Sequence, residues 1–204
     1  RSHAAPKAVV PETPVFVAPQ RLAVPAFLDA RDYETRLTGG PWLWDDYEVD
    51  ERVDHPAGMT LDEPDHTFAT RLYQNPARLH FDAHLMKDSA FGRRLVYGGH
   101  VISLCRALSY EGLENALLIA AINGGTHCNP TFAGDTLYTR TIVLEKWDLP
   151  DRADLGALRL RMLGIKNMVA ADLKDPMIDA GGKKKYHPNV VLDLDYTVLM
   201  PRRS

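Results

Sequence analysis

Hydrophobic and polar residues alternate along the second half of the chain. The alternation has a period of two and is clearest in residues 155–167 and 190–202, while residues 116–123 and 136–147 have a β-rich composition. Such a pattern is typical of strands that turn one face to a core. We therefore predict four strands in this half of the chain.

Two helices are predicted ahead of these strands. Thr60 and Glu63 have the spacing of a capping box, and Pro64 stands in the turn that follows, so one helix is expected to begin here. In residues 98–113 apolar side chains recur at intervals of three and four, which places them on one face of a second, largely buried helix. This stripe consists of Val101, Leu104, Cys105 and Leu108.

A buried helix followed by antiparallel strands indicates the α+β class. We predict the hot-dog fold, in which an antiparallel sheet wraps around a long central helix. Residues 42–55 are predicted to form an entry turn and a further strand, and residues 168–189 an exposed loop that includes the lysines 183–185.

The first 38 residues differ from the rest of the chain because they are rich in proline. Since proline fixes φ and removes a backbone donor, this segment is predicted to be extended, either as a linker or as an arm laid on another surface. The prolines are Pro6, Pro11, Pro14, Pro19 and Pro25. We therefore divide the chain into an arm, 1–38, and a hot-dog domain, 39–204.

Composition and charge exclude two classes of partner. The chain has 204 residues and a formal net charge of −3, so it offers no basic surface for nucleic acid. No run of about 18 apolar residues is present, so no membrane-spanning helix is expected. Two cysteines do not make a disulfide framework, and the first ten residues lack the apolar segment of a secretion signal, so we expect a cytoplasmic protein. The chain begins with Arg1, as a fragment of a longer protein would.

Residues 72–84, LYQNPARLHFDAH, combine titratable side chains with a half-buried pattern. The polar members are Asn75, Arg78, His80, Asp82 and His84. One interpretation is a structural cluster of caps and satisfied histidines. A metal site would use His80 and His84 with His100 or His127, but neither an HExxH nor a CxxC motif is present, so we expect no metal.

The third interpretation is an acid–base site. Burying several polar groups costs a few kcal/mol each unless all are paired, which proteins tolerate more readily where chemistry requires it. A histidine could move a proton near neutral pH, and the YGGH segment (97–100) could supply anion-binding amides at a helix N-terminus. Gly98 and Gly99 could equally serve only a tight turn.

Three ordered motifs resemble those of the MaoC-like hydratases, the hot-dog enoyl-CoA hydratase family. RLHFD (78–82), FGRRLVYGGH (91–100) and PTFAGDTLY (130–138) stand where that family has its histidine, central-helix and P-x-x-x-G-D-T-L motifs. The resemblance covers about residues 42–204. It implies reversible addition of water to an enoyl-CoA, with mesaconyl-CoA as the expected substrate and no cofactor. Members of this kind carry two hot-dog units, so we expect this chain to be the second unit, paired with another hot-dog unit in a homo-oligomer.

The resemblance also implies roles for individual residues. His80 would be the catalytic histidine, and Gly98 would supply the oxyanion N–H, with Gly99 beside it. Asn75 stands where the family has an aspartate, so it could orient a water molecule but not act as a base. Tyr97 replaces the usual histidine.

Three arginines are expected to bind the substrate, because a guanidinium binds a carboxylate through two hydrogen bonds. They are Arg78, Arg93 and Arg94. An alternative alignment on the Asn-Pro pair would place Arg78, rather than His80, at the histidine position. Alternative functions are a general (R)-specific enoyl-CoA hydratase of straight-chain substrates and a non-catalytic subunit that completes a partner's site.

Overall fold

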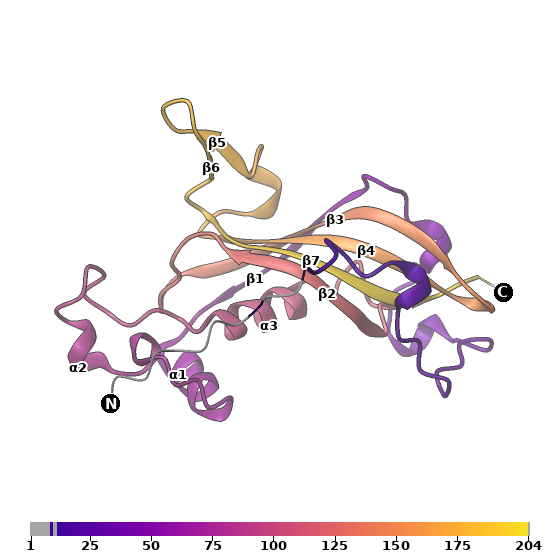
Figure 1. The fold of residues 1–204 in the computed structure, drawn as a ribbon, viewed down its shortest axis with the longest axis horizontal. Coiled ribbons are helices and arrows are strands. Elements are labelled where there is room, and N and C mark those ends of the chain that lie inside the picture. The colour runs from indigo at the N-terminus through magenta and orange to yellow at the C-terminus, as the bar shows by residue number, and fades with distance from the viewer. Residues whose placement is uncertain (1–8, 10–11, 204) are drawn as a thin grey trace.

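The chain forms one long antiparallel sheet with a helix on its inner face (Figure 1). A computed structural model describes residues 9 and 12–203. The elements are β1 (Arg52–Thr60), α1 (Glu63–Leu72), α2 (Ala83–Met86), α3 (Gly98–Leu108), β2 (Leu118–His127), β3 (Thr136–Leu149), β4 (Arg152–Lys166), β5 (Met177–Asp179), β6 (Lys184–Tyr186) and β7 (Val190–Pro201). None of the helices in this part of the chain is long and apolar enough to cross a membrane.

The five long strands pair in the order β1-β3-β4-β7-β2, so β1 and β2 are the two edges. Side chains alternate across the sheet, as the period of two predicts. Leu158, Leu160 and Met162 of β4 are fully buried and belong to one cluster with Val101 and Cys105 of α3. The predicted α+β class and hot-dog arrangement are therefore confirmed, although the central helix ends at Leu108 rather than at residue 113.

Helix α3 lies very close to the sheet at Gly164 of β4. A Cβ at this position would stand 2.7 Å from Cys105 Sγ and 2.9 Å from Leu192 Cβ, and both neighbours are buried. An added methyl group must therefore push the helix or β7 away. We expect Gly164→Ala to lower the free energy of unfolding, measured by chemical denaturation, by about 1–3 kcal/mol, a typical cost of overpacking.

The matched control for this substitution is Gly124→Ala in the edge strand β2. A Cβ on Gly124 would have nothing within 4 Å, so this variant should keep its stability. Equal losses in the two variants would show that crowding at Gly164 is not the cause.

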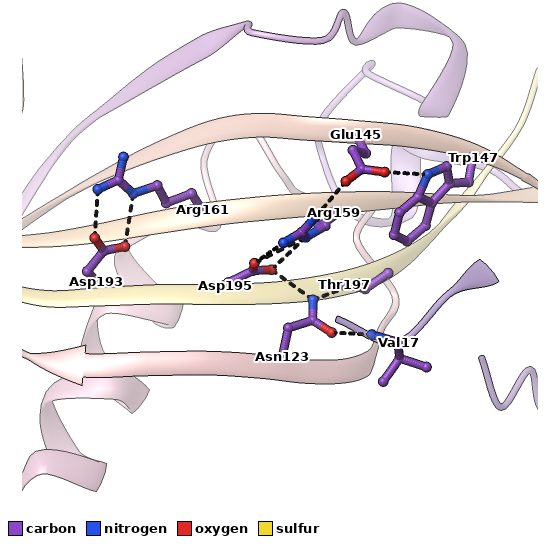
Figure 2. Close-up of polar contacts among 9 residues, drawn as sticks. All are labelled: Val17, Asn123, Glu145, Trp147, Arg159, Arg161, Asp193, Asp195 and Thr197. Atoms are coloured by element: carbon purple, nitrogen blue, oxygen red, sulfur yellow. Dashed lines mark hydrogen bonds and ion pairs between the residues drawn. The ribbon is translucent and has the colours of Figure 1, made fainter. Parts of the chain in front are cut away.

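The outer face of the sheet carries a ladder of ion pairs (Figure 2). Arg161 pairs with Asp193 at 2.7 Å, and Arg159 pairs with both Asp195 and Glu145 at 2.5 Å. These charges stand between two apolar patches, which the chain covers with segments outside the sheet.

The arm covers one of these patches. The Val17 N–H donates to Asn123 Oδ1 of β2 at 3.0 Å, and the Phe16 ring stacks on Trp147 with centroids 5.7 Å apart. Three further arm residues pack on a buried cluster of the sheet: Leu22, Val24 and Leu28. The described part of the arm thus lies on the sheet, whereas residues 1–8 and 10–11 of the predicted arm lie outside the described residues.

Residues 168–189 cover the second patch. Ala170 and Leu173 pack on Leu163 and Ile165 of β4, while the small hairpin β5–β6 projects away from the sheet (Figure 1). The segment predicted to be a loop therefore contains a covering turn and a hairpin.

The predicted capping box is wrong, although the helix is present. Helix α1 begins at Glu63 after the N-cap residue Asp62, whose side chain makes no capping hydrogen bond. Thr60 is instead the last residue of β1, where its hydroxyl hydrogen-bonds with that of Thr136 at 2.8 Å. Thr60 thus pairs with β3 as part of the sheet, although the local pattern assigned it to the helix N-terminus.

The first strand extends past the end of the segment predicted to contain it, residues 42–55. The entry turn is a 3-10 turn, Trp44–Asp46, and the strand Arg52–Thr60 contains Pro56. Proline is tolerated there because β1 is an edge strand, and the pairing with β3 is irregular between His55 and Met59.

Candidate active site

A tight turn after α1 presents His80. Asn75 Oδ1 accepts a hydrogen bond from the Ala77 N–H at 2.8 Å, which forms an Asx turn, and the 3-10 turn Arg78–His80 follows directly. The Leu95 N–H donates to Leu79 O at 3.1 Å. The far end of the loop therefore returns alongside His80.

The ring of His80 is oriented by the backbone. His80 Nδ1 lies 3.1 Å from Leu95 O, and because a carbonyl oxygen only accepts, Nδ1 must carry the proton. Nε2 of the neutral ring then has a free lone pair. The Tyr97 ring packs against His80 with centroids 5.7 Å apart. This arrangement is the one that a general base requires.

Helix α3 begins beside this histidine with two glycines. The His100 and Val101 amides donate to Tyr97 O, whereas those of Gly98 and Gly99 donate to no other described residue. The Tyr97 ring lies over Gly99, because a Cβ at position 99 would stand 2.6 Å from the Tyr97 hydroxyl oxygen. Free amides and the positive end of the helix dipole make this end of α3 a site for negative charge.

His80 and the N-terminus of α3 line one cavity of about 640 Å³. It is lined by His80, by the start of α3 including Tyr97, Gly98 and Gly99, and by residues 127–131 at the end of β2. The sequence indicates no catalytic role for His127, which enters there only as a remote metal ligand. Its position three residues before the P-x-x-x-G-D-T-L motif is the one signal that could have found it.

The cysteine in this cavity is not a nucleophile near neutral pH. Burial, and to a smaller extent the nearby Asp193 carboxylate, raise the pKa of the Cys128 thiol to about 12. A thiol rather than a thiolate is therefore present, and the chemistry falls to the histidines.

Two further histidines, His66 and His100, lie close to the site. Burial lowers the pKa of both rings, and the neighbouring Glu63 and Asp65 carboxylates offset this only in part. His66 is fully buried, and its Nε2 lies 3.3 Å from Glu63 Oε2. Both rings are thus neutral at pH 7.

The cavity brings together His80, Tyr97, Gly98 and Gly99, four of the residues singled out in the sequence. Asn75 does not line it, and its side-chain oxygen accepts a hydrogen bond from the Ala77 N–H.

The three arginines differ in their partners. Arg78 pairs with Asp82 at 3.2 Å, and Arg94 pairs with Glu63. The Arg93 guanidinium instead lies 4.1 Å from the centroid of the Phe132 ring, and no carboxylate of the described residues pairs with it.

Nothing in residues 9 and 12–203 resembles a metal centre. No three histidine, cysteine, aspartate or glutamate side chains of this part of the chain gather closely enough to hold an ion. His84 is exposed on α2 and does not line the cavity with His80.

Comparison with known proteins finds close relatives of this chain. The chain is 53% identical, over 98% of its length, to beta-methylmalyl-CoA dehydratase from Chloroflexus aurantiacus, and 47% identical, over 97%, to mesaconyl-CoA hydratase from Cereibacter sphaeroides. It covers 56% and 55% of these proteins and so spans about half their length. No protein-family model matches the chain.

Solved structures agree. A crystal structure of a MaoC domain protein from Chloroflexus aurantiacus superposes with a TM-score of 0.89 and 51% identity, over 99% of this chain and 56% of that one. A Mycobacterium tuberculosis protein described with a double hotdog fold has a TM-score of 0.55 and 24% identity, over 88% of this chain and 48% of that one, which shows the fold alone.

The sheet around α3 and the cavity at the helix N-terminus define a hot-dog protein. Within that class, the chain is similar over nearly its whole length to a solved MaoC domain protein and to the two CoA-thioester hydratase/dehydratase relatives, as its motifs predict.

Proposed function

We propose that this chain is the catalytic half of a hydratase that reversibly adds water to mesaconyl-CoA and forms β-methylmalyl-CoA. The observation that carries the proposal is the His80 ring, with its free Nε2, in the same cavity as the free amides of α3. Two relatives that are about half identical bear the names of the two directions of this reaction.

The residues act on opposite ends of the enoyl thioester. His80 Nε2 takes a proton from water as the water oxygen attacks the β-carbon, and electron density moves to the thioester oxygen. The Gly98 N–H binds that oxygen, and one such donor is typically worth about 3–4 kcal/mol of barrier. The His80 imidazolium then returns its proton to the α-carbon, so water is added and the ring is restored.

Asn75, which the motif makes the candidate for orienting the water, does not line the cavity. One acceptor position of its side-chain oxygen is engaged by the Ala77 N–H, and its amide nitrogen remains the group that could contact a water molecule.

Arg93 is the candidate for binding the free carboxylate of the substrate. Its guanidinium lies over Phe132, whose ring packs on Phe91 with centroids 5.7 Å apart, and Phe91 lines the cavity. A cation without a carboxylate partner at this position fits a substrate that carries one. Arg78 and Arg94 already have partners of their own.

A second hot-dog unit is the partner that the sheet edge fits. Strand β2 pairs with β7 on one side only, and Leu118, Ile119 and Ile122 expose between 38% and 64% of their surface. An apolar edge strand is a template for pairing with another strand. Because the chain spans about half the length of its relatives, a first hot-dog unit is the partner we propose, within a homo-oligomer.

Side-by-side assays of mesaconyl-CoA and crotonyl-CoA test the substrate assignment. Loss of the enoyl-thioester absorbance should be fast with mesaconyl-CoA and slow with crotonyl-CoA, which has no free carboxylate. Arg93→Ala should raise KM for mesaconyl-CoA about tenfold or more, the effect of losing one charge-assisted hydrogen bond, and leave crotonyl-CoA turnover unchanged. Arg36→Ala, in the arm, is the matched control.

Equal turnover of both substrates would instead assign the chain as a general enoyl-CoA hydratase. Turnover of neither, with the first hot-dog unit added, would assign it as a non-catalytic subunit.

A further inference from the structure

His127, the last residue of β2, lies directly against the start of α3. A Cβ on Gly98 would stand 2.4 Å from His127 Nε2 and 2.7 Å from His127 Cε1. The polar edge of the ring therefore meets the helix end at the residue whose amide is free. Any side chain at position 98 would displace the ring from this place.

Backbone pairing with β7 holds the main chain of His127 in this place. His127 pairs with Leu192 of β7, and the Cys128 N–H donates to Val191 O at 3.0 Å. A little further on, the Val96 N–H donates to Thr131 O at 2.9 Å, which ties this segment to the residues before α3. The imidazole itself makes no hydrogen bond to any described residue. The His127 ring thus lines the cavity with both nitrogens available to a ligand.

The ring is neutral near pH 7. Removal of part of its solvent shell lowers the pKa of His127, and the nearby His80 lowers it further. A neutral imidazole can donate a hydrogen bond to a developing oxyanion without giving up its proton. His80, whose Nδ1–H is engaged by Leu95 O, offers a lone pair instead. In this one cavity, His127 can therefore donate a hydrogen bond, whereas His80 can accept a proton.

We propose that His127 is a catalytic residue, with its Nε2–H binding the thioester oxygen beside the Gly98 N–H. This inference rests on the proposed function and adds a second donor to the oxyanion site. No bond to His127 forms or breaks, and the ring keeps its proton throughout. His80 carries the transferred proton, and His127 stabilises the charge that its action creates.

A chromophoric enoyl thioester tests this role directly. A CoA thioester with a 4-dimethylaminophenyl group on the β-carbon absorbs at longer wavelength when its carbonyl oxygen accepts hydrogen bonds. The wild-type chain should shift this absorbance to the red, and His127→Phe, which has a ring but no donor, should lose a large part of the shift. His127→Gln, which restores an N–H donor, should recover part of it. His84→Ala, outside the cavity, is the matched control and should behave as wild type.

Turnover separates this role from a structural one. His127→Phe should lower kcat about 10²-fold, the typical effect of removing one oxyanion donor, with little change in KM or in the thermal unfolding midpoint. An unchanged red shift and kcat in His127→Phe, while the wild type hydrates its substrate, would overturn the role of His127 and leave the proposed function standing. A wild-type chain that neither shifts the probe nor hydrates an enoyl-CoA would overturn both.

Discussion

Replacing His80 with alanine is expected to lower kcat for enoyl-CoA hydration by about 10²–10⁴-fold, the usual contribution of a positioned general base. The Leu95 carbonyl fixes the proton on His80 Nδ1, so Nε2 is the atom that receives the proton from water. Alanine leaves no titratable group in its place. Substrate binding should change much less, because the free amides of Gly98 and Gly99 remain at the start of α3.

The rate should be measured from the loss of the enoyl-thioester absorbance. His84→Ala removes an exposed histidine four positions away in sequence, on α2, and should keep wild-type kcat. Imidazole added to His80→Ala should restore part of the rate, since the space left by the ring can admit a small base. A folded His80→Ala variant with wild-type kcat would exclude His80 as the base.

Replacing Asp54 with alanine should lower the free energy of unfolding by about 3 kcal/mol, the low end for breaking a buried ion pair. Arg140, of which only 3% of the side chain is exposed, pairs with Asp54 at 2.5 Å across β1 and β3. Without Asp54 its charge would remain buried with a backbone carbonyl as its main partner. Asp54 also accepts from Arg52.

The same pair predicts the direction of a pH effect. Burial opposes ionisation of Asp54, but its hydrogen bonds to Arg52 and Arg140 outweigh this and lower its pKa. Since the folded state binds the proton less readily than the unfolded state, the stabilisation is present above the unfolded pKa of about 4 and is lost as pH falls below it. Denaturation of the wild type and Asp54→Ala at pH 7 and pH 3 should therefore show a smaller difference at pH 3.

An exposed ion pair provides the control for Asp54. Glu34 pairs with Arg36 in the arm, where half or more of each side chain is exposed, so Glu34→Ala should change stability little. If Asp54→Ala were as stable as Glu34→Ala, the buried pair would contribute nothing to the fold.

The strands that form the middle of the sheet were predictable because one of their faces is buried along its whole length. In β4 and β7 the alternation of apolar and polar positions is the direct record of this burial. The edge strand β1 has mostly exposed residues, so its pattern is weak. Thr60 was consequently assigned to a helix cap, a local preference that pairing with β3 overrides.

The site residues likewise fall into those that the sequence could predict and those that it could not. His80 and Gly98 lie in motifs, and a motif can be read from neighbouring residues. The contact between His127 and Gly98 depends on the register of β2 on β7 and on how α3 packs against the sheet, and neither is a local property. The partners of Arg78, Arg93 and Arg94 likewise depend on the path of the loop, so the sequence could propose three arginines but not choose among them.

The most direct test of the hydratase assignment is the reaction of mesaconyl-CoA with the chain in water enriched in ¹⁸O, with the products followed by mass spectrometry. Hydration predicts an intact CoA thioester that has gained one labelled oxygen, on the β-carbon, at a rate that falls in His80→Ala. Free CoA with the label in a released carboxylate would indicate thioester hydrolysis and contradict the assignment, as would an unlabelled substrate recovered unchanged from a folded chain supplied with the first hot-dog unit.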